Sequence, residues 1–231
     1  MNMTRRKHLQ LVAAAAGATA LSGAISLAKE TSMNTKKVTL AKYTNADFYK
    51  DGKFQEDVAK KAYFDMMKSH GYDLHIKYAK KWATDFWVTD FGLGDFAGCG
   101  MGGVFWVNFQ EFNYFAHEIF LLPGQMITEH GHVGTDTAKP KMESWHPRHG
   151  KIYCFGETGG DIPAGVVLPK SQEKFITVHK CTEVESGDIL TLNRLEAKHF
   201  MMGGPEGAIV SEYATFQDKA GLSFSNPGVK F

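Results

Sequence analysis

The chain has 231 residues, of which 43% are hydrophobic and 13% aromatic, so it can bury one sizeable core and one main domain is expected. Its formal net charge is +1 and no basic tract follows the N-terminus, which excludes the electrostatic footprint of a nucleic-acid-binding protein. The widely spaced Cys99, Cys154 and Cys181 form neither a disulfide framework nor a zinc-knuckle pattern. We expect buried thiols, with one disulfide as the alternative.

The first 28 residues have the features of an export signal. TRRK at residues 4–7 precedes an uncharged run of small residues at 11–28, and SLA at 26–28 supplies an A-x-A-like cleavage site. Paired arginines are typical of a twin-arginine signal, which exports folded proteins. The alternative is an uncleaved membrane anchor, for which about 18 residues is a marginal length. We expect a periplasmic or otherwise exported protein without stable membrane insertion after cleavage.

Residues 29–84 are expected to form a polar linker followed by a helical arm. The range 45–70 predicts one helix, which Gly71 ends. Its apolar side chains recur at helical spacing, namely Phe54, Val58, Ala62 and Met66. We place the main domain after this arm, at residues 85–231.

The pattern changes near residue 85 to short aromatic and β-branched segments that glycines interrupt. Several short strands at near-regular spacing indicate an all-β sandwich or barrel. The predicted strands are 87–89, 104–109, 115–122, 152–155, 174–181, 187–192 and 208–216. The sequence therefore predicts a mainly β domain with an N-terminal helical arm.

A dense group of histidines lies within this domain. Four of the ten histidines fall within twenty residues, namely His130, His132, His146 and His149. His130 and His132 are two residues apart, so on a strand they share one face, where two neutral imidazoles can bind one ion. Glu143 follows His132, and His199 comes from a later strand. Three imidazoles and one carboxylate suit a divalent ion such as manganese, iron, cobalt or zinc.

His146 and His149 are alternative ligands that could replace Glu143 and His199. However, Pro147 disrupts strand geometry, and a three-residue spacing in a turn points the two rings apart. We therefore expect a turn at the mouth of the barrel, with a solvated or substrate-facing role.

The order Gly-x5-His-x-His, then Glu, then Gly-Asp-x10-His resembles the two motifs of the cupin superfamily. The first motif runs from Gly124 to His132 and the second from Gly187 to His199. The long gap before Glu143 is similar to that of the cupin-type D-lyxose isomerases. The resemblance covers most of residues 85–231, including TDFGLGDF at 89–96, KME at 141–143 and FSNPGVKF at 224–231. It implies a cupin barrel, also called a double-stranded β-helix or jelly roll, and one divalent ion, with manganese as the first choice.

The resemblance also implies an aldose–ketose isomerase, acting on D-lyxose to give D-xylulose or on a related sugar. Such a reaction through an enediol needs an ion that stabilises the enediolate and a base that moves the proton. Glu212 is the predicted base, since strand alternation puts its carboxylate on an apolar face; a solvated edge glutamate is the alternative. Lys141 is predicted to reach the substrate or neutralise a carboxylate, with a solvated loop lysine as the alternative. A metal-assisted hydride shift would need no base.

His117, Trp145 and His149 are the predicted substrate-binding residues. The resemblance implies a lysine near position 117, so the histidine found there leaves open the contacts with the substrate and the identity of the substrate. The alternative is that His117 is a histidine of the core. Trp145 is the one aromatic side chain predicted in the pocket, out of Trp82, Phe86, Trp87, Phe105, Trp106 and Trp145.

Two other functions stay open for this fold. One is an iron-dependent cupin dioxygenase, which uses a similar ligand set, and the other is a non-catalytic sugar-binding cupin. The expected partner is a small sugar, and a homodimer is suggested by analogy with cupins that pair through exposed strands.

Overall fold

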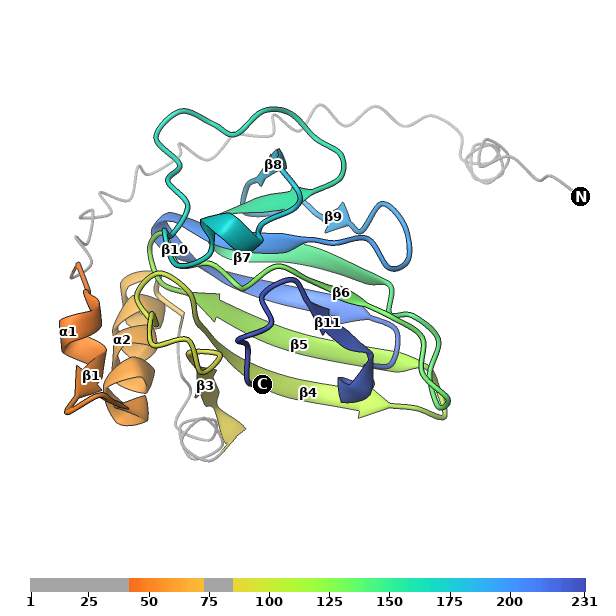
Figure 1. The fold of residues 1–231 in the computed structure, drawn as a ribbon, viewed down its shortest axis with the longest axis horizontal. Helices are drawn as coiled ribbons and strands as arrows, with labels where there is room; N and C mark the ends of the chain where they lie inside the picture. The colour runs from red at the N-terminus through yellow and green to blue at the C-terminus, as the bar shows by residue number, and fades with distance from the viewer. Residues whose placement is uncertain (1–41, 73–84) are drawn as a thin grey trace, which may run out of the picture. The chain divides into compact units, whose positions relative to one another are not determined.

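The structure, a computed structural model, describes residues 42–72 and 85–231, which belong to one compact unit (Figure 1). The predicted signal at 1–28, the linker before residue 42 and residues 73–84 of the predicted arm lie outside the described residues. The domain boundary expected at residue 85 therefore stays a prediction. Within the described ranges, no helix is both long and apolar enough to cross a membrane.

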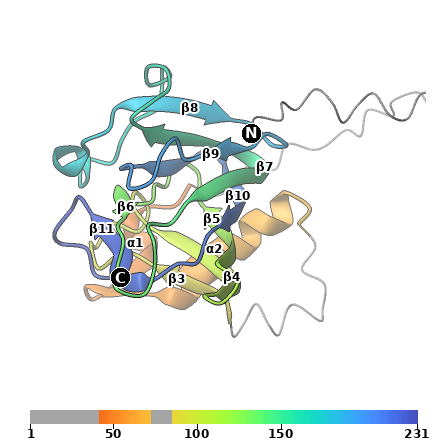
Figure 2. The ribbon, with the colours of Figure 1, turned by 90° about the vertical axis from the view of Figure 1, so that its right-hand side faces the viewer.

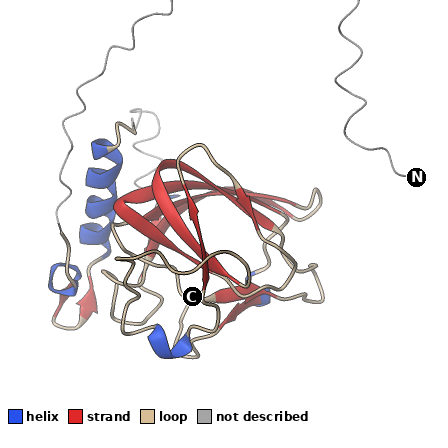
Figure 3. Cartoon of the chain, turned by 90° about the horizontal axis from the view of Figure 1, so that it is seen from above, coloured by secondary structure: helices blue, strands red, loops and turns tan. Residues whose placement is uncertain are grey.

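Antiparallel strands are the main regular structure of the described chain and form a barrel, as the view from above shows (Figure 3). They are β3 (Trp87–Thr89), β4 (Met101–Phe109), β5 (Tyr114–Leu121), β6 (His130–His132), β7 (Glu143–Gly156), β8 (Lys180–Val184), β9 (Leu190–Thr191), β10 (Phe200–Ala214) and β11 (Leu222–Phe224). The main sheet has the order β3-β4-β5-β10-β7-β8, with β9 also paired to β7. The short strands β6 and β11 pair separately and lie side by side in Figure 2. The predicted mainly β fold is confirmed.

The central strands β5 and β10 of the main sheet are buried on both faces, in two different cores. On β5, Ile119 packs in the barrel interior, whereas its neighbour Phe120 packs outside the barrel against α2 (Glu56–Ser69). On β10, Val210 likewise packs in the barrel interior, whereas its neighbour Ile209 packs in the core beside α2. This division follows from the two-residue period of a strand. Full burial of one such side chain stabilises the fold by roughly 1.5–3 kcal/mol.

The predicted single helix at 45–70 is wrong in its first half. The chain instead forms α1 (Asn45–Phe48), a hairpin of β1 (Tyr49–Lys50) and β2 (Lys53–Phe54), and then α2. Asp51 and Gly52 make the hairpin turn with φ values of 51° and 71°, the left-handed conformation that an Asp-Gly turn adopts. α2 keeps the predicted buried face through Ala62 and Met66, and it ends before Gly71, whose φ is 66°.

The predicted strand at 174–181 is wrong over residues 174–179. The 3-10 helix η1 (Glu173–Phe175) overlaps the start of this segment and a loop follows, so that strand pairing begins only at Lys180, in β8. The carboxylate of Glu129 accepts hydrogen bonds from the backbone N–H groups of Thr177 and Val178, at 2.7 and 3.1 Å. These donors are thus satisfied by a side chain and not by a neighbouring strand. The segment predicted at 152–155 belongs to the longer strand β7, that at 208–216 overlaps the end of β10 at residue 214, and that at 187–192 contains β9.

Candidate metal centre and active site

Strand pairing brings three histidines from distant parts of the sequence to one place. His130 and His132 lie two residues apart on β6, so their side chains point to the same face. The backbones of His130 and His199 exchange two hydrogen bonds, with N···O distances of 3.0 and 2.9 Å. As a result, the ring centroids of His130 and His199 are 4.5 Å apart.

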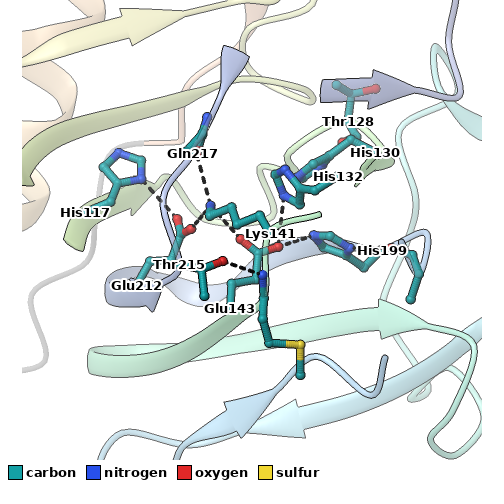
Figure 4. Close-up of polar contacts among 12 residues, drawn as sticks. His117, Thr128, His130, His132, Lys141, Glu143, His199, Glu212, Thr215 and Gln217 are labelled. Atoms are coloured by element: carbon teal, nitrogen blue, oxygen red, sulfur yellow. Dashed lines mark hydrogen bonds and ion pairs between the residues drawn. The ribbon is translucent and has the colours of Figure 1, made fainter. Parts of the chain in front are cut away.

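Glu143, the first residue of β7, completes this cluster. Its Oε1 lies 3.1 Å from Nε2 of His132 and 2.6 Å from Nε2 of His199. One ligand atom from each of the four residues lies within 4.8 Å of the others, and all but the half-buried His130 are buried. The structure therefore brings the four predicted ligands together, as Figure 4 shows.

The backbone orients two of the imidazoles toward the centre of the cluster. Nδ1 of His130 lies 2.9 Å from the carbonyl oxygen of Thr128, and Nδ1 of His199 lies 2.9 Å from that of Ala197. Because a carbonyl oxygen only accepts, each Nδ1 carries the proton and each Nε2 presents a lone pair. Nε2 of His199 is buried, and its contact of 2.6 Å with Oε1 of Glu143 lacks hydrogen-bond geometry. These lone pairs and the carboxylate fit one divalent ion, with positions left open for substrate.

The electrostatics of the cluster favour the protonation states that an ion requires. Burial and the neighbouring His199 and His132 hold the pKa of His130 well below its usual value, so its ring is neutral. Burial by itself would raise the pKa of Glu143, but the adjacent ammonium of Lys141 and the nearby imidazoles of His132 and His199 bring it well below its usual range. Neutral imidazole and ionised carboxylate are the forms that bind metal.

Lys141 connects this cluster to a second buried carboxylate. Its Nζ lies 2.7 Å from Oε2 of Glu143, donates to Oε1 of Glu212, and lies 3.0 Å from Oε1 of Gln217. The ammonium also lies 4.4 Å from the centroid of the Phe115 ring. Burial alone would lower the pKa of Lys141, but the charges of Glu143 and Glu212 raise it. The lysine is thus a buried cation between two carboxylates and not a solvated loop residue.

Glu212 is buried as predicted for a base, with 4% of its surface exposed. On β10 it is paired with His117 on β5 and with Trp145 on β7, so the three side chains share the inner face of the sheet. Nδ1 of His117 lies 3.1 Å from Oε2 of Glu212. The Trp145 ring lies 5.2 Å from that of His199, at 42°. Figure 4 shows Lys141 between Glu143 and Glu212, with His117 beyond Glu212.

These groups line a small cavity of about 60 Å³ inside the barrel. Its wall contains the four candidate metal ligands and apolar side chains of the C-terminal segment. It also contains Lys141, Glu212, His117 and Trp145. A second cavity of about 490 Å³ adjoins it. The two cavities share Trp87, Phe105, Gln217 and Phe231 in their walls, so these four residues lie between them.

The structure does not bring His149 or His146 to this cavity. The predicted turn is wrong, because β7 continues through both residues. The pairing of β7 with β10 shifts register by one residue at Arg148, and a one-residue slip turns the following side chain to the other face. The ring of His149 therefore lies outside the barrel, 5.8 Å from that of Tyr72 and 5.7 Å from that of His70.

Several cavity residues were not predicted from the sequence. Trp87 and Phe105 line both cavities, although the sequence nominated Trp145 alone among the aromatic residues. The C-terminal segment supplies Phe224 and Phe231, because β11 pairs with β6 beside the histidines. No local sequence pattern predicts this pairing. The resemblance of residues 224–231 to the cupin-type D-lyxose isomerases could have suggested that the C-terminal segment contributes to the site. Of the other aromatic residues, Phe86 lies in the core under α2, Trp106 donates to Glu118 at 3.4 Å, and Trp82 lies outside the described residues.

The three cysteines take no part in the cluster. Cys99, Cys154 and Cys181 all lie in the described part of the chain and are buried as free thiols, which confirms the first expectation. Burial raises the pKa of Cys181 to about 11, so its thiol stays protonated at neutral pH.

Curated sugar isomerases are similar to this chain in sequence, although no known protein-family profile matches it. The chain is 34% identical to a D-lyxose/D-mannose isomerase of Thermosediminibacter oceani over 137 residues, which are 59% of this chain and 74% of that protein. It is 36% identical to a D-lyxose ketol-isomerase of Cohnella laeviribosi over 120 residues, and 30% identical to one of a Thermofilum species over 119 residues. Each of these two matches covers 51% of this chain and 64% of the relative.

Solved structures of the same fold include two L-ribose isomerases. That of Acinetobacter sp. DL28 has a TM-score of 0.58 at 15% identity, and the match covers 75% of this chain and 92% of the other. That of Cellulomonas parahominis has a TM-score of 0.58 at 14% identity, with the same two shares. These likenesses, with the antiparallel barrel, confirm the predicted cupin fold with a small helical N-terminal part.

Proposed function

The chain belongs to the D-lyxose isomerase family of sugar isomerases, and on this premise we propose that it converts D-lyxose or a related aldose to the ketose with a bound divalent ion. The observation that carries the proposal is the convergence, in one cavity, of the four candidate metal ligands and the buried Glu212. Manganese is the ion we propose, with iron, cobalt and zinc as the alternatives for the same donor set.

When bound, the ion would supply a Lewis acid that stabilises negative charge on the substrate oxygens. Glu212 would act as the base. In the direction from aldose to ketose, it takes the proton from C2 and returns it to C1, while the proton on O2 is transferred to O1. General acid–base help of this kind typically accelerates a reaction by about 10²–10⁴-fold.

Lys141 holds Glu212 in place for this proton transfer. Its ammonium contacts both Glu212 and Glu143, so it offsets the repulsion between the two carboxylates. The surrounding wall is largely apolar, with Trp145 and Phe224 beside the histidines. Such a wall limits the access of water, which protects an enediol and strengthens the electrostatic contacts.

The decisive experiment is to incubate the manganese-loaded protein with a panel of aldopentoses and aldohexoses and to measure ketose formation. We expect turnover of D-lyxose or a stereochemically related aldose, loss of turnover on chelation, and recovery on adding the ion back. A protein shown to carry one ion per chain that forms no ketose from any sugar would refute the proposal.

We also propose export through residues 1–28 and a homodimeric state. The paired arginines at positions 5 and 6 support the first, and the analogy with other cupins supports the second. An Arg5→Lys, Arg6→Lys variant should accumulate in the cytoplasm while the wild-type protein reaches the periplasm. Light scattering coupled to size-exclusion chromatography tests the dimer, and a monomer mass at micromolar concentration would exclude it.

A further inference from the structure

His117 occupies a fitted socket beside Glu212. Its ring is stacked on Trp87, with a centroid distance of 5.4 Å and an interplanar angle of 15°. On another side Phe105 lies 4.7 Å away at 31°, and Phe115 contacts it edge-on at 5.8 Å. Only 4% of the surface of His117 is exposed, so the surrounding rings determine where the imidazole lies.

Gly103 on β4 makes the room for this ring. A Cβ atom at this position would lie 2.3 Å from Nε2 of His117 and 2.7 Å from the Trp87 ring. Both distances are too short for real contacts, and Gly103 does not have the left-handed φ that would by itself favour glycine. The absence of a side chain at Gly103 is therefore a steric requirement of the His117 position.

The hydrogen bond from His117 has a defined direction. The ionised carboxylate of Glu212 only accepts, so Nδ1 carries the proton and donates to Oε2 over 3.1 Å. Nε2 faces Gly103 and has no hydrogen-bond partner in the described ranges. The contact with Glu212 is thus the one use that the structure makes of this ring's polar atoms.

The two oxygens of Glu212 are held from opposite sides. Lys141 donates to Oε1 and His117 donates to Oε2 (Figure 4). In the described part of the chain, the charged groups that face His117 are Glu212, Lys141 and Glu143. With both oxygens engaged, the carboxylate has one orientation relative to the cavity.

We propose that His117 is a positioning residue, which holds the Glu212 carboxylate in the orientation that the proton transfer requires. This role differs from the sugar contact expected from the sequence, because His117 acts through Glu212. The inference rests on the proposed function, in which Glu212 is the base. A misplacement of about 1 Å in a reacting group can reduce the rate by about 10²-fold, so the loss of this donor should be visible in kcat.

The first test removes and then restores the donor. We expect His117→Leu to reduce kcat by about 10²-fold with little change in KM, and to move the acid limb of the kcat–pH profile to higher pH. The limb moves up because a carboxylate that loses a hydrogen-bond donor becomes easier to protonate. His117→Asn, whose side-chain amide can present an N–H near the position of Nδ1, should recover most of kcat and return the limb toward the wild-type pH.

The second test displaces the ring without altering it. Gly103→Ala should push His117 away from Glu212 and reproduce the kinetic defect of His117→Leu. Gly102→Ala is the matched control, because its Cβ would lie 2.8 Å from Phe86 and from Tyr63, in the core on the opposite face of β4. It should lower the melting temperature without moving the acid limb. Manganese content and melting temperature are measured for every variant.

The outcomes separate this inference from the proposed function. Wild-type turnover with unchanged kcat and pH limb in both His117→Leu and Gly103→Ala would show that His117 only fills space, and would overturn the inference alone. A raised KM with unchanged kcat in His117→Leu would show direct sugar binding and would also overturn it. A wild-type protein without turnover on any aldose would refute the proposed function first.

Discussion

Lys141 and Glu143 lie two residues apart in the sequence, and in the folded protein Nζ of Lys141 lies 2.7 Å from Oε2 of Glu143. The same ammonium contacts Glu212. One buried cation therefore joins a candidate metal ligand to the candidate base, and the charge balance of the cavity depends on it. With Lys141 removed, two buried carboxylates would be left without their shared cation.

Lys141→Met should impair both stability and activity. Breaking a buried ion pair by removing one partner typically costs about 3–5 kcal/mol of folding free energy. Glu212 should become harder to ionise, so we expect kcat at neutral pH to fall by about 10²-fold or more. Urea unfolding and initial rates measure the two effects. Lys151→Met is the control, because Lys151 pairs with Glu183 and Glu185 at the surface and should contribute at most about 1 kcal/mol. Equal behaviour of the two variants would contradict the central role of Lys141.

Glu212→Gln distinguishes proton transfer through an enediol from a hydride shift. The amide cannot accept the C2 proton, so we expect kcat to fall by about 10²–10⁴-fold. Metal content should stay at the wild-type level, since Glu212 is not in the ligand cluster. Solvent deuterium should enter C1 of the ketose in the wild-type reaction. A Glu212→Gln variant with near-wild-type kcat and no deuterium in the product would exclude a base mechanism.

Metal binding should be lost in the double variant His130→Ala, His132→Ala, and in Glu143→Gln it should weaken. The first removes two of three imidazoles and the second removes the ligand charge, while neither changes Glu212. Metal analysis after dialysis against trace manganese measures both effects. A His146→Ala, His149→Ala variant is the matched control, because these residues lie away from the cavity, and it should retain full occupancy. Unchanged manganese in the first double variant would refute the site.

Acid should destabilise the metal-free protein through the same residues. The pKa of His130 lies well below its value of 6.5 in an unfolded chain, so below pH 6.5 the unfolded state binds more protons than the folded one. Stability from this group is present above pH 6.5 and is lost as the pH falls toward the folded pKa. Glu143 has a lowered pKa as well, so its contribution is present above its unfolded value of about 4.5 and is lost below it.

We therefore expect the melting temperature of the chelated protein to fall between pH 7 and pH 5. The His130→Ala, His132→Ala variant should show a smaller decrease, because it lacks His130, which becomes protonated on unfolding. Differential scanning calorimetry at several pH values provides the measurement. An equal slope in both proteins would show that other residues cause the acid sensitivity.

Glu129 should be essential for the cavity wall although it contacts no substrate group. Its buried carboxylate accepts from Thr177 and Val178 and, at 2.5 Å, from the hydroxyl of Ser225 in the C-terminal segment. Glu129→Ala leaves these buried donors without their acceptor, at a cost of about 2–4 kcal/mol. Since the same segment supplies Phe224 to the cavity, we expect KM to rise as well. Glu129→Gln, which keeps one acceptor oxygen, should lose less stability on urea titration. A Glu129→Ala protein of wild-type stability and KM would contradict this role.

Local patterns predicted more of the metal cluster than of the catalytic groups. The two-residue spacing of His130 and His132 was sufficient to place both rings on one face, because side chains alternate along any strand. Glu143 and His199 were predicted from their places in later β segments, and the resemblance of the spacing to cupin motifs agreed with this choice. In contrast, Asp51-Gly52 is a local sequence signal for a hairpin turn. The helix at 45–70 was nevertheless predicted, because apolar residues recur there at helical spacing.

Register explains why the prediction for His149 failed while those for Glu212 and Trp145 reached the cavity. Glu212 and Trp145 are direct partners across β10 and β7, before the shift at Arg148, whereas His149 follows it. A shift of one residue reverses the face of every later side chain. Pro147 signals that the strand is irregular nearby, but it does not fix the residue at which the shift occurs.

The amino-acid sequence by itself determined the mainly β class, the buried thiols and the donor types of the candidate metal site, because these depend on residue chemistry and on the fixed period of a strand. The tertiary structure alone decided which side chains share the cavity, including the contact of Lys141 with two carboxylates and the socket of His117. These contacts depend on pairing between strands far apart in the sequence. Their register is set by packing of the whole barrel, which no short segment encodes.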